Sequence, residues 1–94
     1  MFLDPKLVSA GVLSRADQTK RVIAIAGAQA LEYFRNREQL IVETKMEPQD
    51  VVSIADRNVE ITIIEGLQAH FPEDGFLGEE QGITEGKNNY LWVI

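Results

Sequence analysis

The stretch FPEDGFLGEEQG, residues 71–82, marks the change from a helix to a strand. Pro72 helps to end the helix, because proline lacks an amide hydrogen and keeps the residue before it out of the helical conformation. The segment DGFLGEE, residues 74–80, predicts a short strand whose apolar pair lies between two glycines. Two adjacent acids, Glu79 and Glu80, follow the second of these glycines. Two neighbouring negative charges at the end of an apolar strand suggest either a binding site or a pair of solvated side chains.

The composition is that of one small globular domain. The chain has 94 residues, of which 45% are hydrophobic and 26% charged, and a second core is not expected at this length. Fifteen acidic residues against nine basic ones give a net charge of −6, which argues against nucleic acid or an anionic membrane as a partner. An anionic substrate stays possible, because a bound cation reverses the field locally.

The lack of cysteine, of a membrane-spanning stretch and of a secretory signal excludes several kinds of site and location. The sequence has no cysteine, which excludes disulfides, thiolate nucleophiles and cysteine-based zinc sites. The longest mostly apolar stretch, residues 22–31, is too short and too polar to span a bilayer. The N-terminus, MFLDPK, contains an acid and a proline where a secretory signal needs an apolar run. We therefore expect a cytoplasmic protein.

The first half of the chain predicts an arm, a helix and a hairpin. Residues 1–13 are weakly patterned and are expected to form an N-terminal arm. Residues 16–36 carry apolar side chains at helical spacing, with Ser14 as a cap. The β-branched segment 40–45 is followed by turn residues, so we expect it to form a hairpin with residues 51–53.

The second half predicts another helix and two strands. This helix is expected to begin at Ser53, with Asp56 at its third position in a capping arrangement. Residues 81–88 are expected to form a polar loop before a final strand at residues 88–94. The overall class is α/β, with layers of helix and sheet. The apolar face of the second helix repeats every four residues: Val59, Ile63, Leu67 and Phe71.

The acidic pair has two interpretations on the residues alone. Successive side chains of a regular strand point to opposite faces, so only one of Glu79 and Glu80 can enter a cleft. From spacing alone, two solvated glutamates at a strand end are the more common explanation of such a pair. Asp56 has a structural alternative as well, since an acid near a helix start interacts with free amides and the helix dipole. Lys45, beside a turn, is ordinarily a solvated side chain, and His70 is expected to be a capping or surface residue.

Three segments taken together resemble the inositol monophosphatase family of metal-dependent phosphatases. They are DVVSIADRNVE (residues 50–60), FPEDGFLGEEQG (71–82) and YLWVI (90–94), in the family's order and approximate spacing. The resemblance covers roughly residues 16–94. It implies that residues 1–94 are a single partial domain, in which residues 14–94 belong to a layered α+β sandwich. The expected part has two main helices and an incomplete, mostly antiparallel sheet.

The resemblance also implies roles for individual residues. Glu79 corresponds to the first glutamate of the family's GEE motif, which binds a catalytic Mg²⁺. Glu80 is the neighbouring, less direct acid. Asp56 corresponds to an aspartate that orients a threonine, which in turn positions the attacking water. Lys45 occupies the place of a lysine near the metal. The implied reaction is hydrolysis of a small phosphorylated alcohol or sugar by metal-activated water.

This sequence departs from the family pattern after its last strand. The family continues there with Asp-Pro-x-Asp-Gly-Thr, which supplies further metal ligands and the threonine, and this sequence ends at Ile94. A later aspartate ligand and the substrate pocket are also missing, and no substrate-binding residue is predicted. We therefore expect the N-terminal segment of a phosphatase, which alone binds Mg²⁺ weakly or not at all and has no activity.

Two alternatives stay open. A relative that hydrolyses histidinol phosphate or another phosphate ester has the same motifs. A non-catalytic α/β module that binds a protein partner is also compatible, because the apolar segment YLWVI offers unpaired backbone groups for edge pairing. The partners expected are a small phosphorylated metabolite, the remaining part of the same protein and a second copy of the chain.

Overall fold

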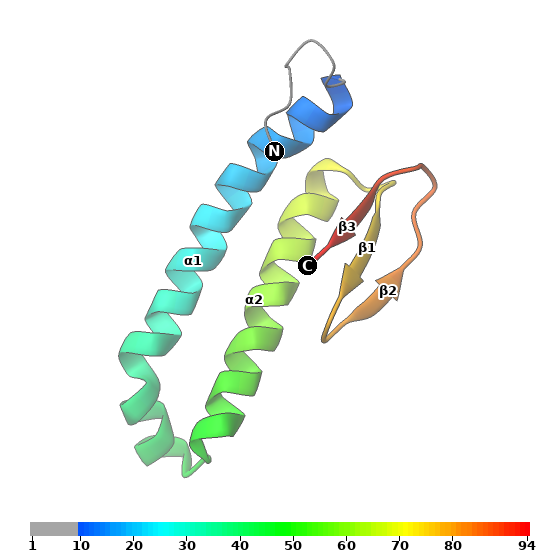
Figure 1. Cartoon of the computed structure of the whole chain (residues 1–94). Coiled ribbons are helices and arrows are strands. Elements are labelled where there is room, and N and C mark those ends of the chain that lie inside the picture. Colours follow the sequence, from blue (N-terminus) through cyan, green and yellow to red (C-terminus); the bar gives the residue numbers. More distant parts are fainter. Residues whose placement is uncertain (1–9) are drawn as a thin grey trace, which may run out of the picture.

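The computed structural model describes residues 10–94, which form two long helices and a small sheet (Figure 1). The elements are α1 (Ala10–Thr44), α2 (Pro48–His70), β1 (Gly75–Gly78), β2 (Gly82–Thr84) and β3 (Leu91–Val93). The two helices lie side by side and antiparallel, and the sheet lies beside the C-terminal half of α2. The predicted α/β class with two main helices is confirmed.

Helix α1 begins earlier than predicted. Residues 1–9 of the predicted arm lie outside the described residues, whereas residues 10–13 already belong to α1. The cap predicted at Ser14 is therefore wrong. The physical reason is the side chain of Arg15, whose Nη1 donates to the Gly11 carbonyl at 3.0 Å while its other nitrogens hold Asp74. Neither described helix has an apolar stretch of the length needed to cross a membrane.

The predicted hairpin between residues 40–45 and 51–53 is wrong. The first segment is the end of α1 with one residue of the following connection, and the second lies inside α2. β-Branched residues favour a strand only where a half-buried pleated surface receives them, and an isolated hairpin is marginal in water. Local contacts favour the helix instead, since Gln39 Nε2 donates to Glu43 Oε1 at 3.0 Å.

Helix α2 begins at Pro48, ahead of the predicted start at Ser53. Glu47 is the N-cap residue, with an extended backbone (φ −68°, ψ 150°) and no side-chain hydrogen bond to the helix. Proline suits the first helical position, because its missing amide hydrogen has no partner there in any helix. Asp56 therefore lies about two turns inside α2, beyond the free amides that its predicted capping role requires.

The sheet is mixed, with β1 in the centre. Strand β1 pairs antiparallel with β2 and parallel with β3, whereas a mostly antiparallel sheet was expected. The strands predicted at residues 74–80 and 88–94 are present, although each is shorter than predicted. Strand β2 lies in residues 81–88, which were predicted as a loop. All three of its residues are exposed, so no alternation of apolar and polar residues indicated a strand.

The core lies between the sheet and both helices. Phe76 of β1 is fully buried, and it packs with Val22 of α1 and Leu67 of α2. The apolar face predicted for α2 is thereby confirmed. Partly buried side chains extend this core: Ile63, Ile64, Trp92 and Ile94.

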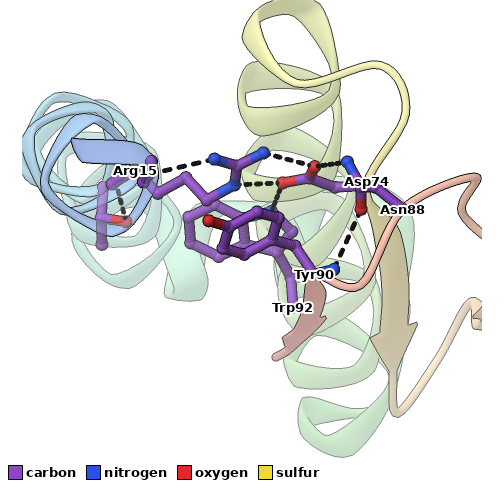
Figure 2. A network of polar contacts seen from close by, with 7 residues as sticks. Arg15, Asp74, Asn88, Tyr90 and Trp92 are labelled. Carbon is purple, nitrogen blue, oxygen red and sulfur yellow. Dashed lines mark hydrogen bonds and ion pairs between the residues drawn. The ribbon is translucent and has the colours of Figure 1, made fainter. Parts of the chain in front are cut away.

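A buried carboxylate joins α1 to the sheet. Asp74, directly before β1, is 2% exposed. Arg15 Nε donates to Asp74 Oδ2 and Arg15 Nη2 to Oδ1, both at 2.7 Å (Figure 2). The amide of Asn88 donates to Oδ1 at 2.7 Å, and the indole N–H of Trp92 donates to Oδ2 at 2.8 Å. Four donors from three parts of the chain thus satisfy one acid.

Aromatic rings complete the environment of Arg15. Its guanidinium lies 3.6 Å from the centroid of the Tyr90 ring and 4.5 Å from that of Phe71. A cation over the face of an aromatic ring is attracted by the ring's quadrupole. Hydrogen bonding by Arg15, then by Asn88 and Trp92, lowers the pKa of Asp74 from 3.8 to about 2, although burial acts in the opposite direction.

Asp74→Asn should lower the free energy of unfolding by about 2–4 kcal/mol. The asparagine amide cannot accept the paired hydrogen bonds of Arg15, and it leaves the guanidinium without its anion. Chemical denaturation followed by Trp92 fluorescence measures the change. Asp17→Asn, at an exposed position of α1, is the control and should change stability by less than about 0.5 kcal/mol. Equal effects of the two substitutions would contradict the role of Asp74.

The depressed pKa of Asp74 predicts acid sensitivity of the fold. The stability it contributes is complete above its ordinary pKa of 3.8 and is lost as the pH falls from 3.8 towards 2. The loss should amount to about 2 kcal/mol. Denaturation curves at pH 5 and pH 2 measure it in the parent chain and in Asp74→Asn. The variant should lack this component, so parallel losses in both proteins would refute the assignment.

Candidate functional site

The predicted acidic pair lies in the turn between β1 and β2. Glu79 and Glu80 follow the last residue of β1, and both side chains are exposed. The turn closes at Gly82, whose φ of +75° lies in the left-handed region that glycine adopts without strain. Because the two acids are in a turn, the alternation of a regular strand does not separate them onto opposite faces.

A buried acid of α2 holds this turn. Glu60 is 7% exposed, and its carboxylate accepts hydrogen bonds from two consecutive amides of the turn. The Glu80 amide donates to Oε1 and Oε2 at 3.1 Å each, and the Gln81 amide donates to Oε2 at 2.7 Å. Hydrogen bonds to an ionised acceptor are stronger than those between neutral groups. The backbone that carries Glu79 and Glu80 is therefore fixed to α2.

Gly78 makes the approach of Glu60 possible. A Cβ atom at this position would lie 2.6 Å from Glu60 Cδ and 2.8 Å from each carboxylate oxygen. Any larger residue would push the carboxylate away from the turn. The absence of a Cβ at Gly78 thus lets the Glu60 carboxylate lie against the backbone of β1.

Glu60 was not among the site residues predicted from the sequence, although its place on an apolar helix face indicated a buried acid. It stands on the same apolar face as its neighbours Ile63, Ile64 and Leu67, at spacings of three, four and seven residues. An acid on an otherwise buried helix face needs hydrogen-bond donors. Such donors come from the backbone of a distant turn here, and the local pattern does not identify them.

Asp56 lies one helical turn before Glu60 on α2, so the two side chains share a face of the helix, about 6 Å apart along its axis. The Asp56 side chain is exposed. It also borders a mainly apolar cavity of about 250 Å³ between the helices, together with Tyr33 and Phe34 of α1. Asp56 thus faces the region between the helices, and no hydrogen bond or ion pair joins it to Glu60, Glu79 or Glu80 among residues 10–94.

Lys45 lies in the connection between the helices, at the end of the helix pair away from the sheet (Figure 1). Its backbone has a φ of 56°, in the left-handed region, and its side chain is exposed. The hairpin on which it was expected does not exist. The ion pair found among the described residues is that of Arg15 with Asp74, and none joins Lys45 to the predicted acids.

The described residues supply only part of a metal site. Residues 10–94 contain no group of three or more acidic or histidine side chains that could hold a metal ion. Glu79 and Glu80 offer exposed carboxylate oxygens, which are the donors that Mg²⁺ prefers. The donor type fits, but an octahedral ion needs further ligands or waters. A larger cavity of about 580 Å³ follows α1 from Gln29 to Glu43 and contains none of the predicted site residues.

Known proteins resemble the chain over most of its length. The profile of the inositol monophosphatase family matches residues 14–94. The chain is 41% identical over 69 residues to a histidinol-phosphatase of Chlorobaculum parvum. The aligned residues make up 73% of this chain and 26% of that protein. It is 33% identical over 78 residues to a fructose-1,6-bisphosphatase/inositol-1-monophosphatase of Aquifex aeolicus. These residues make up 82% of this chain and 29% of that protein.

An uncharacterized protein of Sinorhizobium fredii is 40% identical over 68 residues, which cover 72% of this chain and 24% of that protein. The chain therefore spans about a quarter of the length of the curated relatives it matches. No solved structure matches it significantly.

Lys45→Gly should raise the free energy of unfolding by about 0.5–1 kcal/mol, because glycine adopts the left-handed conformation without the steric cost of a Cβ. Thermal and chemical denaturation measure the gain. Lys20→Gly is the matched control, since Lys20 is exposed inside α1 and glycine should destabilise a helix interior by about 1 kcal/mol. A loss of stability in both variants would refute the backbone explanation.

Proposed function

Because the chain belongs to the inositol monophosphatase family, we propose that it is the N-terminal segment of a Mg²⁺-dependent phosphomonoesterase. The proposed substrate is a small phosphorylated alcohol or sugar. Histidinol phosphate is an alternative, supported by the name of the relative from Chlorobaculum parvum. Since the chain spans about a quarter of its relatives, the complete activity is proposed for a protein in which further segments join this one.

The exposed Glu79 carboxylate, in a turn fixed by a buried acid, is the observation that supports the proposal most. A metal ligand is effective when its backbone is already in place, since less order is lost on binding. Glu79 provides a carboxylate oxygen for the cation, and Glu80 adds negative charge beside it. Asp56, one turn from Glu60, is proposed to orient a hydroxyl group of the remaining protein towards the attacking water.

Charge explains why a cation is needed at this turn. Two exposed carboxylates repel a phosphate ester, and the chain as a whole has a charge of −6. A bound divalent ion reverses the local field. Magnesium, when bound, supplies Lewis-acid polarisation of the phosphoryl oxygen and a more acidic water.

The outer face of the sheet favours a second function, association with a protein surface. Leu77 lies between Ile83 and Val93 in the register of the three strands, and these two neighbours are 70% and 72% exposed. A row of exposed apolar side chains on one face is typical of an interaction surface. A non-catalytic module, a homodimer or a contact with the remaining part of a longer protein would each use this row.

A paramagnetic metal titration tests the proposed role of Glu79. Mn²⁺, which takes the same oxygen ligands as Mg²⁺, should broaden the amide resonances of Glu79 and Glu80 in the 94-residue chain before those of other residues. Glu79→Gln should weaken this binding about tenfold or more, because it removes the charged ligand. Excess Mg²⁺ should restore the resonances.

The control is Glu65→Gln, which removes an exposed acid of α2 and should leave the broadening unchanged. Equal broadening in Glu79→Gln and the parent chain would reject Glu79 as a ligand and favour the interaction module. The 94-residue chain should release no phosphate from inositol-1-phosphate with Mg²⁺, because its donors do not complete the metal shell. Turnover by this chain would overturn that expectation.

A further inference from the structure

The carboxylate of Glu60 fixes two consecutive peptide planes, because it accepts the amides of both Glu80 and Gln81. The amide hydrogen and carbonyl oxygen of a trans peptide point in opposite directions. The carbonyl groups of Glu79 and Glu80 therefore point away from the Glu60 carboxylate. The contact thus sets the direction of the backbone on which the exposed acids stand.

We propose that Glu60 is a positioning residue for the cation-binding turn: its buried carboxylate aligns the backbone so that Glu79 meets the metal without reordering. The inference rests on the function proposed above. It assigns Glu60 no contact with substrate or cation. Its effect passes through the two amides, which lie immediately C-terminal to Glu79.

The carboxylate form of Glu60 is essential to this role. An ionised carboxylate has two acceptor oxygens and no donor, whereas a glutamine amide has one acceptor and a donating NH₂ group. The Glu80 amide contacts both oxygens equally, at 3.1 Å. In Glu60→Gln, one of these contacts becomes a donor facing a donor. The turn loses part of its support while the volume of the side chain is preserved.

The charge of Glu60 also couples the turn to the cation. Its carboxylate accepts hydrogen bonds from backbone amides, which leave its negative charge in place, and it has no ion pair among the described residues. The negative charge of Glu60 lies behind a turn that carries two exposed acids, so the three like charges repel one another, weakly across solvent. A bound cation relieves that repulsion, so Glu60 should contribute more to metal affinity than a neutral side chain of the same shape.

Two variants test the inference from opposite sides of the contact. Glu60→Gln changes the acceptor, and Gly78→Ala places a methyl group where the carboxylate lies. Each should speed hydrogen exchange of the Glu80 and Gln81 amides about tenfold or more, measured by NMR without metal. Each should also weaken Mn²⁺ binding at the turn severalfold. The double variant should be little worse than either single one, because both remove the same contact.

Matched controls separate this role from general destabilisation. Glu65→Gln removes another acid of α2, and Gly27→Ala fills an open position on α1 where a Cβ meets nothing within 4 Å. Neither should change the exchange of the turn or its affinity for Mn²⁺. Circular dichroism establishes that the helices persist in each variant. If Glu60→Gln fails to fold, Gly78→Ala still tests the contact with the native acid present.

The possible results separate the inference from the proposed function. Unchanged exchange of Glu80 and Gln81 in the variants overturns the positioning role. Faster exchange with unchanged Mn²⁺ affinity makes Glu60 purely structural and also overturns it. Absence of Mn²⁺ broadening at the turn of the parent chain overturns the positioning role of Glu60 in this chain, whereas the proposed function, which needs further segments to complete the metal shell, is rejected only by a protein that contains them and fails to bind the ion. Faster exchange together with weaker Mn²⁺ binding supports the inference.

Discussion

A buried carboxylate needs a counter-charge and hydrogen-bond donors beside it, and the donors of Asp74 come from distant segments of the chain. This requirement constrains the whole fold. The Asp74 oxygens receive donors from α1, from the loop before β3 and from β3 itself. These segments are far apart in sequence, since Arg15 and Asp74 are separated by 59 residues. Removal of any donor leaves part of a buried charge unpaired, which is expensive at low dielectric. The same point therefore determines where α1, the loop and the parallel strand meet.

Strand β1 has such a constraint at each of its ends. Asp74 precedes it, and the Glu60 carboxylate holds the turn that follows it. Phe76, between them, is fully buried against the helices. A slip of one residue in this strand would turn Phe76 to the outer face and would also separate each acid from its donors. The register of a four-residue strand is thus defined by polar contacts as well as by apolar packing.

The sequence predicts the elements that depend on local pattern. The apolar face of α2, its end before Pro72 and the runs around Phe76 and Trp92 are all present. Residues 40–45 show the limit of propensity, because their β-branched side chains continue a helix when no sheet receives them. Strand β2 has only exposed residues, so its pairing with β1 had no apolar signature. The network of Asp74 depends on contacts over long sequence distances, which no local pattern reports.

The candidate site shows the same division between local and distant information. The GEE motif located the exposed acids Glu79 and Glu80, but their support by Glu60 comes from an element twenty residues earlier. That support fixes the backbone of the turn, while the two acid side chains stay exposed in solvent that screens their repulsion. A turn whose acids lie open to solvent, on a backbone already fixed, loses little order when a cation binds. Under the proposed function, the fold positions the acids before any ion binds, and a divalent ion at the turn would then reverse the local field for a phosphate ester.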